Sequence, residues 1–254
     1  MIDTHIHADL RSGEDFKEMY LSGIDVAITC GFYPYKVDNE IVLLNHLNRI
    51  LKLETERAFE HGLKLKVALG IHPTNTKINP KMIYESLYNW IKSREIIAIG
   101  EIGLENLTVD EINIFKKQLD IADETKTKVI IHTPRKNKAK VLKVILDILP
   151  QHIDEKLAVI DHINPSVVNS VINKDCMLGL TVQPQKMTKE EAITILNEYG
   201  FDKFLLNSDI STKASDPLSV PKTIRELQKQ NYNKKDIEKV SFLNAEKANA
   251  DRKS

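Results

Sequence analysis

The sequence has few cysteines, few aromatic residues and no excess of charge of either sign. Its two cysteines, Cys30 and Cys176, form no CxxC motif and cannot build a disulfide framework. We therefore expect buried free thiols in a reducing compartment, and a cytoplasmic protein. The 36 basic residues balance the 36 acidic ones, so the composition gives no global electrostatic footprint for nucleic acid or for an anionic membrane.

Long hydrophobic runs are also missing from the sequence. No run approaches the roughly 18 apolar residues that a membrane span needs, so we expect no membrane partner. We expect no signal peptide either, because the first predicted strand begins at Ile2. The chain length suits a single domain over 1–254 or two small ones, and α/β barrels commonly reach this size as one domain.

Eight short runs rich in Ile and Val recur along the chain, and they are apolar nearly throughout. Such runs are typical of strands buried on both faces of a parallel sheet. The predicted strands are 2–7, 25–30, 66–72, 96–103, 128–132, 157–163, 177–182 and 204–209. Helical patterns lie between them at 109–126, 137–149 and 187–200. This alternation predicts a single-domain (β/α)8 TIM barrel, with an open, doubly wound sheet as the alternative.

Chemically capable side chains gather at the predicted carboxyl ends of these strands, where TIM barrels place their functional residues. Five of the eight histidines lie there, and so do two acids. These residues are His5, His7, His72, Glu101, His132, His162 and Asp209. One such histidine alone is more simply a hydrogen-bonded core residue. A buried carboxylate without a partner costs several kcal/mol, so it needs an arginine or a metal beside it. Together these residues predict a metal site.

Six short motifs carry a resemblance to a known family. In chain order they are DTHIH, GIHP, GEIGL, IIH, DH and SD. They resemble the TatD-type metal-dependent hydrolases of the amidohydrolase superfamily, and the likeness runs from Asp3 to Asn244. GIHP and GEIGL are its specific parts. The resemblance implies a TIM barrel, a centre of one or two metal ions, and hydrolysis, often of DNA phosphodiesters.

Carried over onto this sequence, the resemblance assigns metal ligands. His5 and His7 are implied as ligands of a first metal ion. His132 and His162 are implied as ligands of a second ion, and Glu101 as the carboxylate that bridges the two. No lysine ends the fourth predicted strand, so Glu101 rather than a carbamylated lysine would form the bridge.

The same resemblance implies that Asp209 touches the first metal and the attacking water. Asp209 and Glu101 are therefore the catalytic candidates. Asp209 could take the proton of the water and later deliver it to the leaving group. Imidazole and carboxylate ligands suit zinc, manganese, cobalt or nickel, and the ligand set alone does not choose among them. We expect one or two divalent transition-metal ions, with zinc as the first choice.

The loops that follow these motifs depart from the family pattern. Asn207 stands where the family usually has a glutamate, and no proline follows Asp209 closely. Pro134 takes the place of the usual arginine, which displaces Arg135 by one residue. The segment INPS after His162 replaces an aromatic-and-glycine turn. We therefore expect an intact metal centre with divergent substrate-facing loops, so that the resemblance implies DNase activity only weakly.

His72 and Arg135 are the candidate substrate-binding residues. His72 could bind a phosphate or hydrogen-bond a metal ligand, or it could be an ordinary turn histidine before Pro73. Arg135 could meet an anionic substrate, or it could belong to a solvated basic turn. The aromatic residues of 31–35 could stack on bases, or could pack on one another.

The function that we expect is metal-dependent hydrolysis of a phosphoester, in a nucleic-acid end or a nucleotide, through a metal-activated water. The first alternative is hydrolysis of an amide or lactone in a small molecule, because the same water chemistry serves both. The second is a non-catalytic metal-binding scaffold. The expected partner is an anionic small molecule or a nucleic acid, and the sequence does not predict an oligomeric state.

Overall fold

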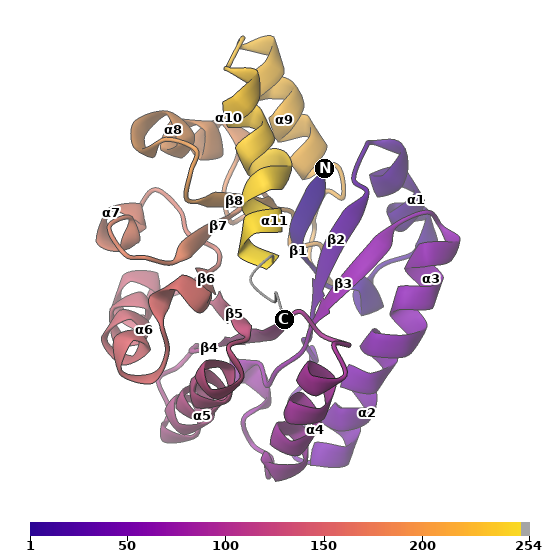
Figure 1. Ribbon diagram of the computed structural model, residues 1–254, viewed down its shortest axis with the longest axis vertical. Helices are drawn as coiled ribbons and strands as arrows, with labels where there is room; N and C mark the ends of the chain where they lie inside the picture. Colours follow the sequence, from indigo (N-terminus) through magenta and orange to yellow (C-terminus); the bar gives the residue numbers. More distant parts are fainter. Residues whose placement is uncertain (250–254) are drawn as a thin grey trace.

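The computed structural model describes residues 1–249, and these form one barrel of parallel strands surrounded by helices (Figure 1). The strands follow one another around the barrel in chain order. They are β1 (Ile2–Ile6), β2 (Val26–Cys30), β3 (Lys64–Ala68), β4 (Ala98–Gly103), β5 (Lys128–His132), β6 (Ala158–Ile160), β7 (Met177–Thr181) and β8 (Phe204–Asn207). The predicted (β/α)8 TIM barrel is confirmed and the open sheet is wrong. The predicted domain also includes residues 250–254, which lie outside the described residues.

The first and last strands meet through main-chain hydrogen bonds just beyond their carboxyl ends. The Asp209 N–H donates to the carbonyl of His5 at 2.9 Å, and the His7 N–H donates to the carbonyl of Ile210 at 2.9 Å. Lower down, the Thr4 hydroxyl donates to the carbonyl of Leu206 at 3.0 Å. These bonds join the two ends of the sheet, so that residues about 200 positions apart in the sequence become neighbours.

Helices cover the outside of the barrel, and the three predicted ones are confirmed within a few residues. The helices are α1 (Gly13–Leu21), α2 (Glu40–Arg49), α3 (Thr55–Glu60), α4 (Lys81–Lys92), α5 (Val109–Thr125), α6 (Lys138–His152), α7 (Val168–Val171), α8 (Lys189–Tyr199), α9 (Ser219–Lys229), α10 (Lys234–Glu238) and α11 (Asn244–Asn249). α8 begins with a capping box. The Glu191 N–H donates to the Thr188 hydroxyl at 3.2 Å, and the Thr188 N–H donates to the Glu191 carboxylate at 2.8 Å.

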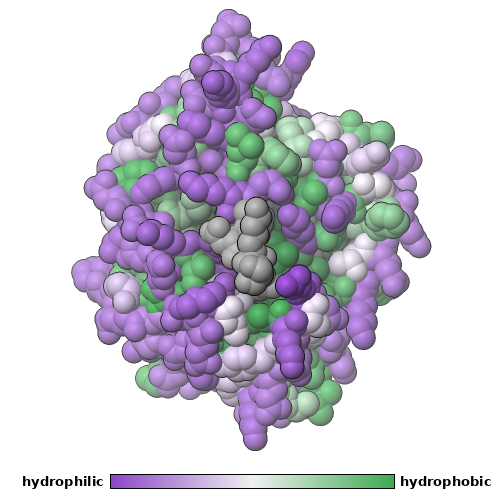
Figure 2. Space-filling model, in the orientation of Figure 1, coloured by the Kyte–Doolittle hydropathy of each residue, from purple (hydrophilic) through white to green (hydrophobic). Residues whose placement is uncertain are grey.

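The amino-terminal end of the barrel is closed by α11, which lies across this end in Figure 1. Ala245 packs inside the barrel with Ile2, Ile28 and Leu205. The Asn244 amide donates to the carbonyls of Phe201 and Phe204, both at 2.8 Å. Figure 2 shows hydrophilic side chains over much of this face, with hydrophobic ones in smaller groups between them. The predicted site residues lie at the opposite, carboxyl-terminal end of the barrel.

Several predicted strands run too far at their carboxyl ends. β3 ends at Ala68 instead of 72, β6 ends at Ile160 instead of 163, and β8 ends at Asn207 instead of 209. The chain stays buried past these ends, as at Leu69 and Ile71, and it keeps single main-chain hydrogen bonds to neighbouring strands, such as that from the Gly100 N–H to the Leu69 carbonyl at 3.1 Å. The apolar pattern therefore continues into the loop. As a result His72, His162 and Asp209 lie in the loops just after their strands and not in the strands themselves.

Both cysteines, Cys30 and Cys176, are buried and free, as expected. None of the helices within residues 1–249 is long and apolar enough to cross a membrane.

Candidate metal centre

The structure brings seven of the eight predicted site residues together at the carboxyl-terminal end of the barrel. They are His5 in β1, His7 just after it, His72 after β3, Glu101 in β4, His132 at the end of β5, His162 after β6 and Asp209 after β8. Six of these residues line a cleft of about 440 Å³, and His5 lies fully buried beneath it. Arg135, the eighth residue, lines the wall of the same cleft.

Glu101 lies at the centre of this group and is 2 % exposed. Five imidazoles each direct one ring nitrogen toward its carboxylate. These nitrogens are His5 Nε2 (3.5 Å), His7 Nε2 (3.7 Å) and His72 Nε2 (3.8 Å) around Oε2, and His132 Nδ1 (2.8 Å) and His162 Nε2 (2.9 Å) at Oε1. Burial disfavours a charged carboxylate, but the surrounding histidines outweigh it and hold the pKa of Glu101 well below its usual value.

The other ring nitrogen of each imidazole is held by a second partner. His5 Nδ1 is 2.6 Å from Asp161 Oδ2, His7 Nδ1 is 3.1 Å from the Cys30 carbonyl, His72 Nδ1 is 2.8 Å from the Thr74 hydroxyl, His132 Nε2 is 2.8 Å from Glu105 Oε2, and His162 Nδ1 is 2.7 Å from the Thr181 hydroxyl. Metal-ligating histidines typically show this arrangement, because the outer bond fixes the tautomer and the direction of the ring.

Asp161 is a functional residue that the sequence reasoning missed. Its Oδ2 holds His5, while its Oδ1 accepts the His162 N–H at 3.0 Å and the Asn207 amide at 2.8 Å. Gly179 in β7 leaves the room that this carboxylate needs, since a Cβ there would lie 1.7 Å from Asp161 Oδ1. A signal was available, because Asp161 follows a buried apolar run in the same way as Glu101 interrupts one.

Asp209 faces the histidines with one carboxylate oxygen and Lys186 with the other. Its Oδ1 lies 3.2 Å from His7 Nε2 and 3.9 Å from His5 Nε2. Its Oδ2 pairs with the Lys186 ammonium and lies 3.3 Å from the Gln183 amide nitrogen. Burial disfavours the charged form, but Lys186 and His7 outweigh it and hold the pKa of Asp209 well below its usual value. Lys186 and Gln183 could not be predicted from a local pattern, because both come from the loop after β7.

Two site residues adopt backbone conformations that side chains other than glycine rarely take. His162 has a φ of 60° and Asp209 a φ of 46°, both in the left-handed region. Such residues cost on the order of 1–3 kcal/mol each and persist where the surrounding structure holds them. Here the His162 N–H is bound by Asp161 and the Asp209 N–H by the His5 carbonyl. The strained backbone at these two positions directs both side chains into the cleft.

The cluster fits a divalent metal ion. Three groups of side chains hold their ligand atoms within 4.8 Å of one another: His5, His7 and Asp209; His5, Glu101 and His162; and His72, Glu101 and His132. Within the described chain, His5 Nε2 is buried and has no hydrogen-bond partner, although it faces Glu101 and Asp209. A cation between these ligand atoms would satisfy that nitrogen and the clustered carboxylates at once.

Cationic side chains line the cleft and the smaller pocket beside it. The Arg135 guanidinium donates to Gln183 Oε1 at 2.8 Å. The Lys138 ammonium donates to the Thr133 hydroxyl at 2.7 Å and to the His162 carbonyl at 2.9 Å. Burial, with the charge of Lys186 added, lowers the pKa of Lys138 to about 7. The sequence reasoning missed Lys138, which opens α6 and looks like an ordinary helix-surface residue.

The aromatic loop after β2 divides its side chains between two roles. Phe32 packs against the rings of His7 and His72, with centroids 5.1 Å and 4.8 Å away. Tyr33 and Tyr35 pack on each other, with centroids 6.0 Å apart. The interpretation of rings packed on one another is therefore confirmed for the two tyrosines, whereas Phe32 forms part of the cleft wall.

Comparisons with known proteins agree with this geometry. An uncharacterized metal-dependent hydrolase of Methanocaldococcus jannaschii is 42% identical over 225 residues, which cover 88% of this chain and 89% of that protein. The crystal structure of a TatD-like protein from Archaeoglobus fulgidus superposes with a TM-score of 0.82 at 28% identity, covering 98% of this chain and 99% of that one. The fold and the site thus define a metal-dependent hydrolase built on a TIM barrel.

The family follows from a match over almost the whole chain. The model of the family described as TatD related DNase matches residues 2–249. The chain belongs to the TatD family, as the sequence motifs indicated. More distant barrels share the fold alone: an organophosphorus hydrolase from Deinococcus radiodurans has a TM-score of 0.68 at 14% identity, covering 98% of this chain and 91% of that one.

Proposed function

We propose that this protein hydrolyses a phosphoester, such as a nucleic-acid end or a nucleotide, at a centre of one or two divalent transition metals, with zinc as the first choice. The observation that carries this proposal is the cationic lining of the cleft around the histidine–carboxylate cluster, to which Arg135, Lys136, Lys186 and Lys213 contribute. Lys186 is paired with Asp209, whereas Arg135 makes no ion pair with a carboxylate within residues 1–249. Uncommitted cations at a cleft favour a substrate that brings negative charge.

We assign the ligands as the cluster suggests. His5, His7 and Asp209 would hold one ion. His132 and His162, which both contact Glu101 Oε1, would hold a second, with Glu101 between the two sites. His72 is a further candidate, because it groups with Glu101 and His132. When bound, such ions lower the pKa of water and stabilise charge on the oxygens of a phosphoester.

The chain's own residues would then position the reaction. Asp209 would accept the proton of the attacking water, with its carboxylate held in place by Lys186. Arg135 would bind the phosphate oxygens from the outer side of the cleft. Phe32 would exclude water from the side of His7 and His72.

A neutral amide or lactone substrate would make no use of these cations, and a scaffold would have no use for a strained and buried carboxylate–histidine cluster. The phosphoester is therefore the better-supported substrate class. A cytoplasmic location remains our prediction, on the ground of the two buried free thiols.

The test is an activity screen of metal-reconstituted protein against a phosphodiester, a phosphomonoester and a lactone. We expect hydrolysis of a phosphoester, and we expect Arg135→Ala to raise KM for it while leaving any lactone hydrolysis unchanged. Lys140→Ala is the matched control, because Lys140 is an exposed cation on α6 outside the cleft. Faster hydrolysis of the lactone than of either phosphoester would overturn the proposal.

A further inference from the structure

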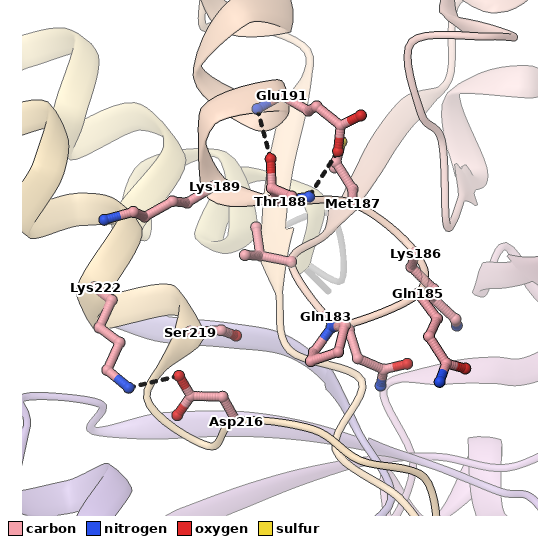
Figure 3. A pocket seen from close by; sticks show the side chains of 12 residues that line it. Gln183, Gln185, Lys186, Met187, Thr188, Lys189, Glu191, Asp216, Ser219 and Lys222 are labelled. Atoms are coloured by element: carbon pink, nitrogen blue, oxygen red, sulfur yellow. Dashed lines mark hydrogen bonds and ion pairs between the residues drawn. The ribbon is translucent and has the colours of Figure 1, made fainter.

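A second cavity of about 510 Å³ lies beside the metal centre at the same end of the barrel. It is bounded by the loop after β7 and by the start of α9. In the view of Figure 3, Gln183 and Lys186 lie on one side, and Lys222, Asp216 and Ser219 lie on the other. Cavities that bind small organic molecules commonly measure about 300–1,000 Å³, so this one is large enough for a ring-sized group.

The wall between this cavity and the metal centre is shared. Lys186 lines both the cavity and the cleft of the metal centre. Its ammonium pairs with Asp209, and the Gln183 amide also reaches that carboxylate, at 3.3 Å. A molecule whose phosphate lies against Lys186 at the centre could therefore extend its other end into the cavity.

Ser219 gives the cavity one unused hydrogen-bonding group. Its side chain is 5 % exposed, and its hydroxyl oxygen has no hydrogen-bond partner within residues 1–249. Buried hydroxyls are normally paired, so an unpaired one that lines a cavity points to a group that enters it.

Two of the lysines at the rim are already paired with carboxylates. Lys222 pairs with Asp216 at 2.6 Å, and Lys189 pairs with Glu226 at 3.4 Å. The aliphatic part of the lining comes from Val182, Pro184 and Met187. The cavity thus matches a neutral and largely apolar group better than a second anion.

We propose that this cavity binds the organic group of a phosphoester whose phosphate lies at the metal centre. The group is ring-sized, neutral and largely apolar, and carries one atom that hydrogen-bonds to Ser219. This inference rests on the proposed phosphoester function and adds the class of alcohol that the ester contains.

The test measures binding of two non-hydrolysable phosphonates to metal-loaded protein by calorimetry. We expect 1-naphthylphosphonate to bind on the order of tenfold more tightly than methylphosphonate, because the ring buries apolar surface in the cavity. Pro184→Trp narrows the cavity from its exposed side and should reduce this preference to less than threefold. Affinity for methylphosphonate should stay unchanged. Pro165→Trp places the same substitution on the exposed loop after β6, outside the cavity, and should keep the preference.

A second variant tests the hydroxyl. Ser219→Ala should weaken a hydroxyl-bearing naphthylphosphonate about two- to tenfold and leave the plain naphthyl compound unchanged. Binding of both phosphonates without a preference for the ring, or a preference that Pro184→Trp leaves intact, would refute the cavity while sparing the phosphoester function. If metal-loaded protein binds neither phosphonate, the proposed function fails and the inference fails with it.

Discussion

Replacing Asp161 by asparagine should weaken metal binding although Asp161 is not itself a proposed ligand. Its carboxylate holds His5 Nδ1 at 2.6 Å, which directs the unpaired Nε2 toward Glu101 and Asp209. An amide has nearly the same shape but lacks the charge that favours this orientation of the ring. Loss of such an outer partner typically costs 10- to 100-fold in metal affinity. That range corresponds to about 1.4–2.7 kcal/mol.

The assay is a competition titration with a chelator of known affinity, on protein that circular dichroism shows to be folded. Asp120→Asn is the matched control, because Asp120 makes the same kind of bond to His152 Nδ1, at 2.7 Å, on the outer helices α5 and α6. We expect wild-type metal affinity for this control. Gly179→Ala should resemble Asp161→Asn, since the added Cβ displaces the Asp161 carboxylate. Folded Asp161→Asn protein with wild-type metal affinity would refute the role of this residue.

Three further predictions concern the ligands and the thiols. Glu101→Gln should lower the metal content found by elemental analysis. Asp209→Asn should keep metal, and its kcat should fall by a factor of about 10²–10⁴. A kcat near the wild-type value with metal bound would exclude Asp209 as the proton acceptor. Metal affinity should fall as pH drops below 7. Glu101 and Glu105 raise the pKa of His132 above its usual value, against the effect of burial, so that a proton competes increasingly with the metal ion for this ring. A metal affinity independent of pH between 5 and 7 would contradict this prediction. Burial raises the pKa of Cys30 to about 11 and of Cys176 to about 12. Neither thiol should therefore react with a disulfide reagent at pH 8 until denaturant is added. Rapid reaction of the folded protein would show that the thiols are accessible.

The barrel and its central side chains could be predicted from the sequence because they have local signatures. A strand buried on both faces produces a continuous apolar run, and a polar residue such as Glu101 within or just after that run stands out. The strand ends were less predictable. The segments after β3 and β8 remain buried, so hydrophobicity does not distinguish a paired strand from the loop that follows it.

The partners of the central side chains could not be predicted in the same way. Asp161 meets His5 across 156 positions, and Lys186 meets Asp209 from a different loop. Such contacts depend on the register and closure of the whole barrel, and no periodic pattern encodes them. The cavity beside α9 could not be predicted from the sequence for the same reason, because its two walls come from loops on either side of β8.

The seam between β1 and β8 has a consequence for how the protein matures. The proposed ligands His5 and His7 leave the ribosome early, but Asp209 joins them only when the last strand pairs with the first. A nascent chain that ends before β8 therefore carries histidines without the carboxylate that completes their site. The metal ion should bind after the barrel has closed. It should then stabilise the closed barrel, because an ion that binds only the closed form stabilises the entire fold.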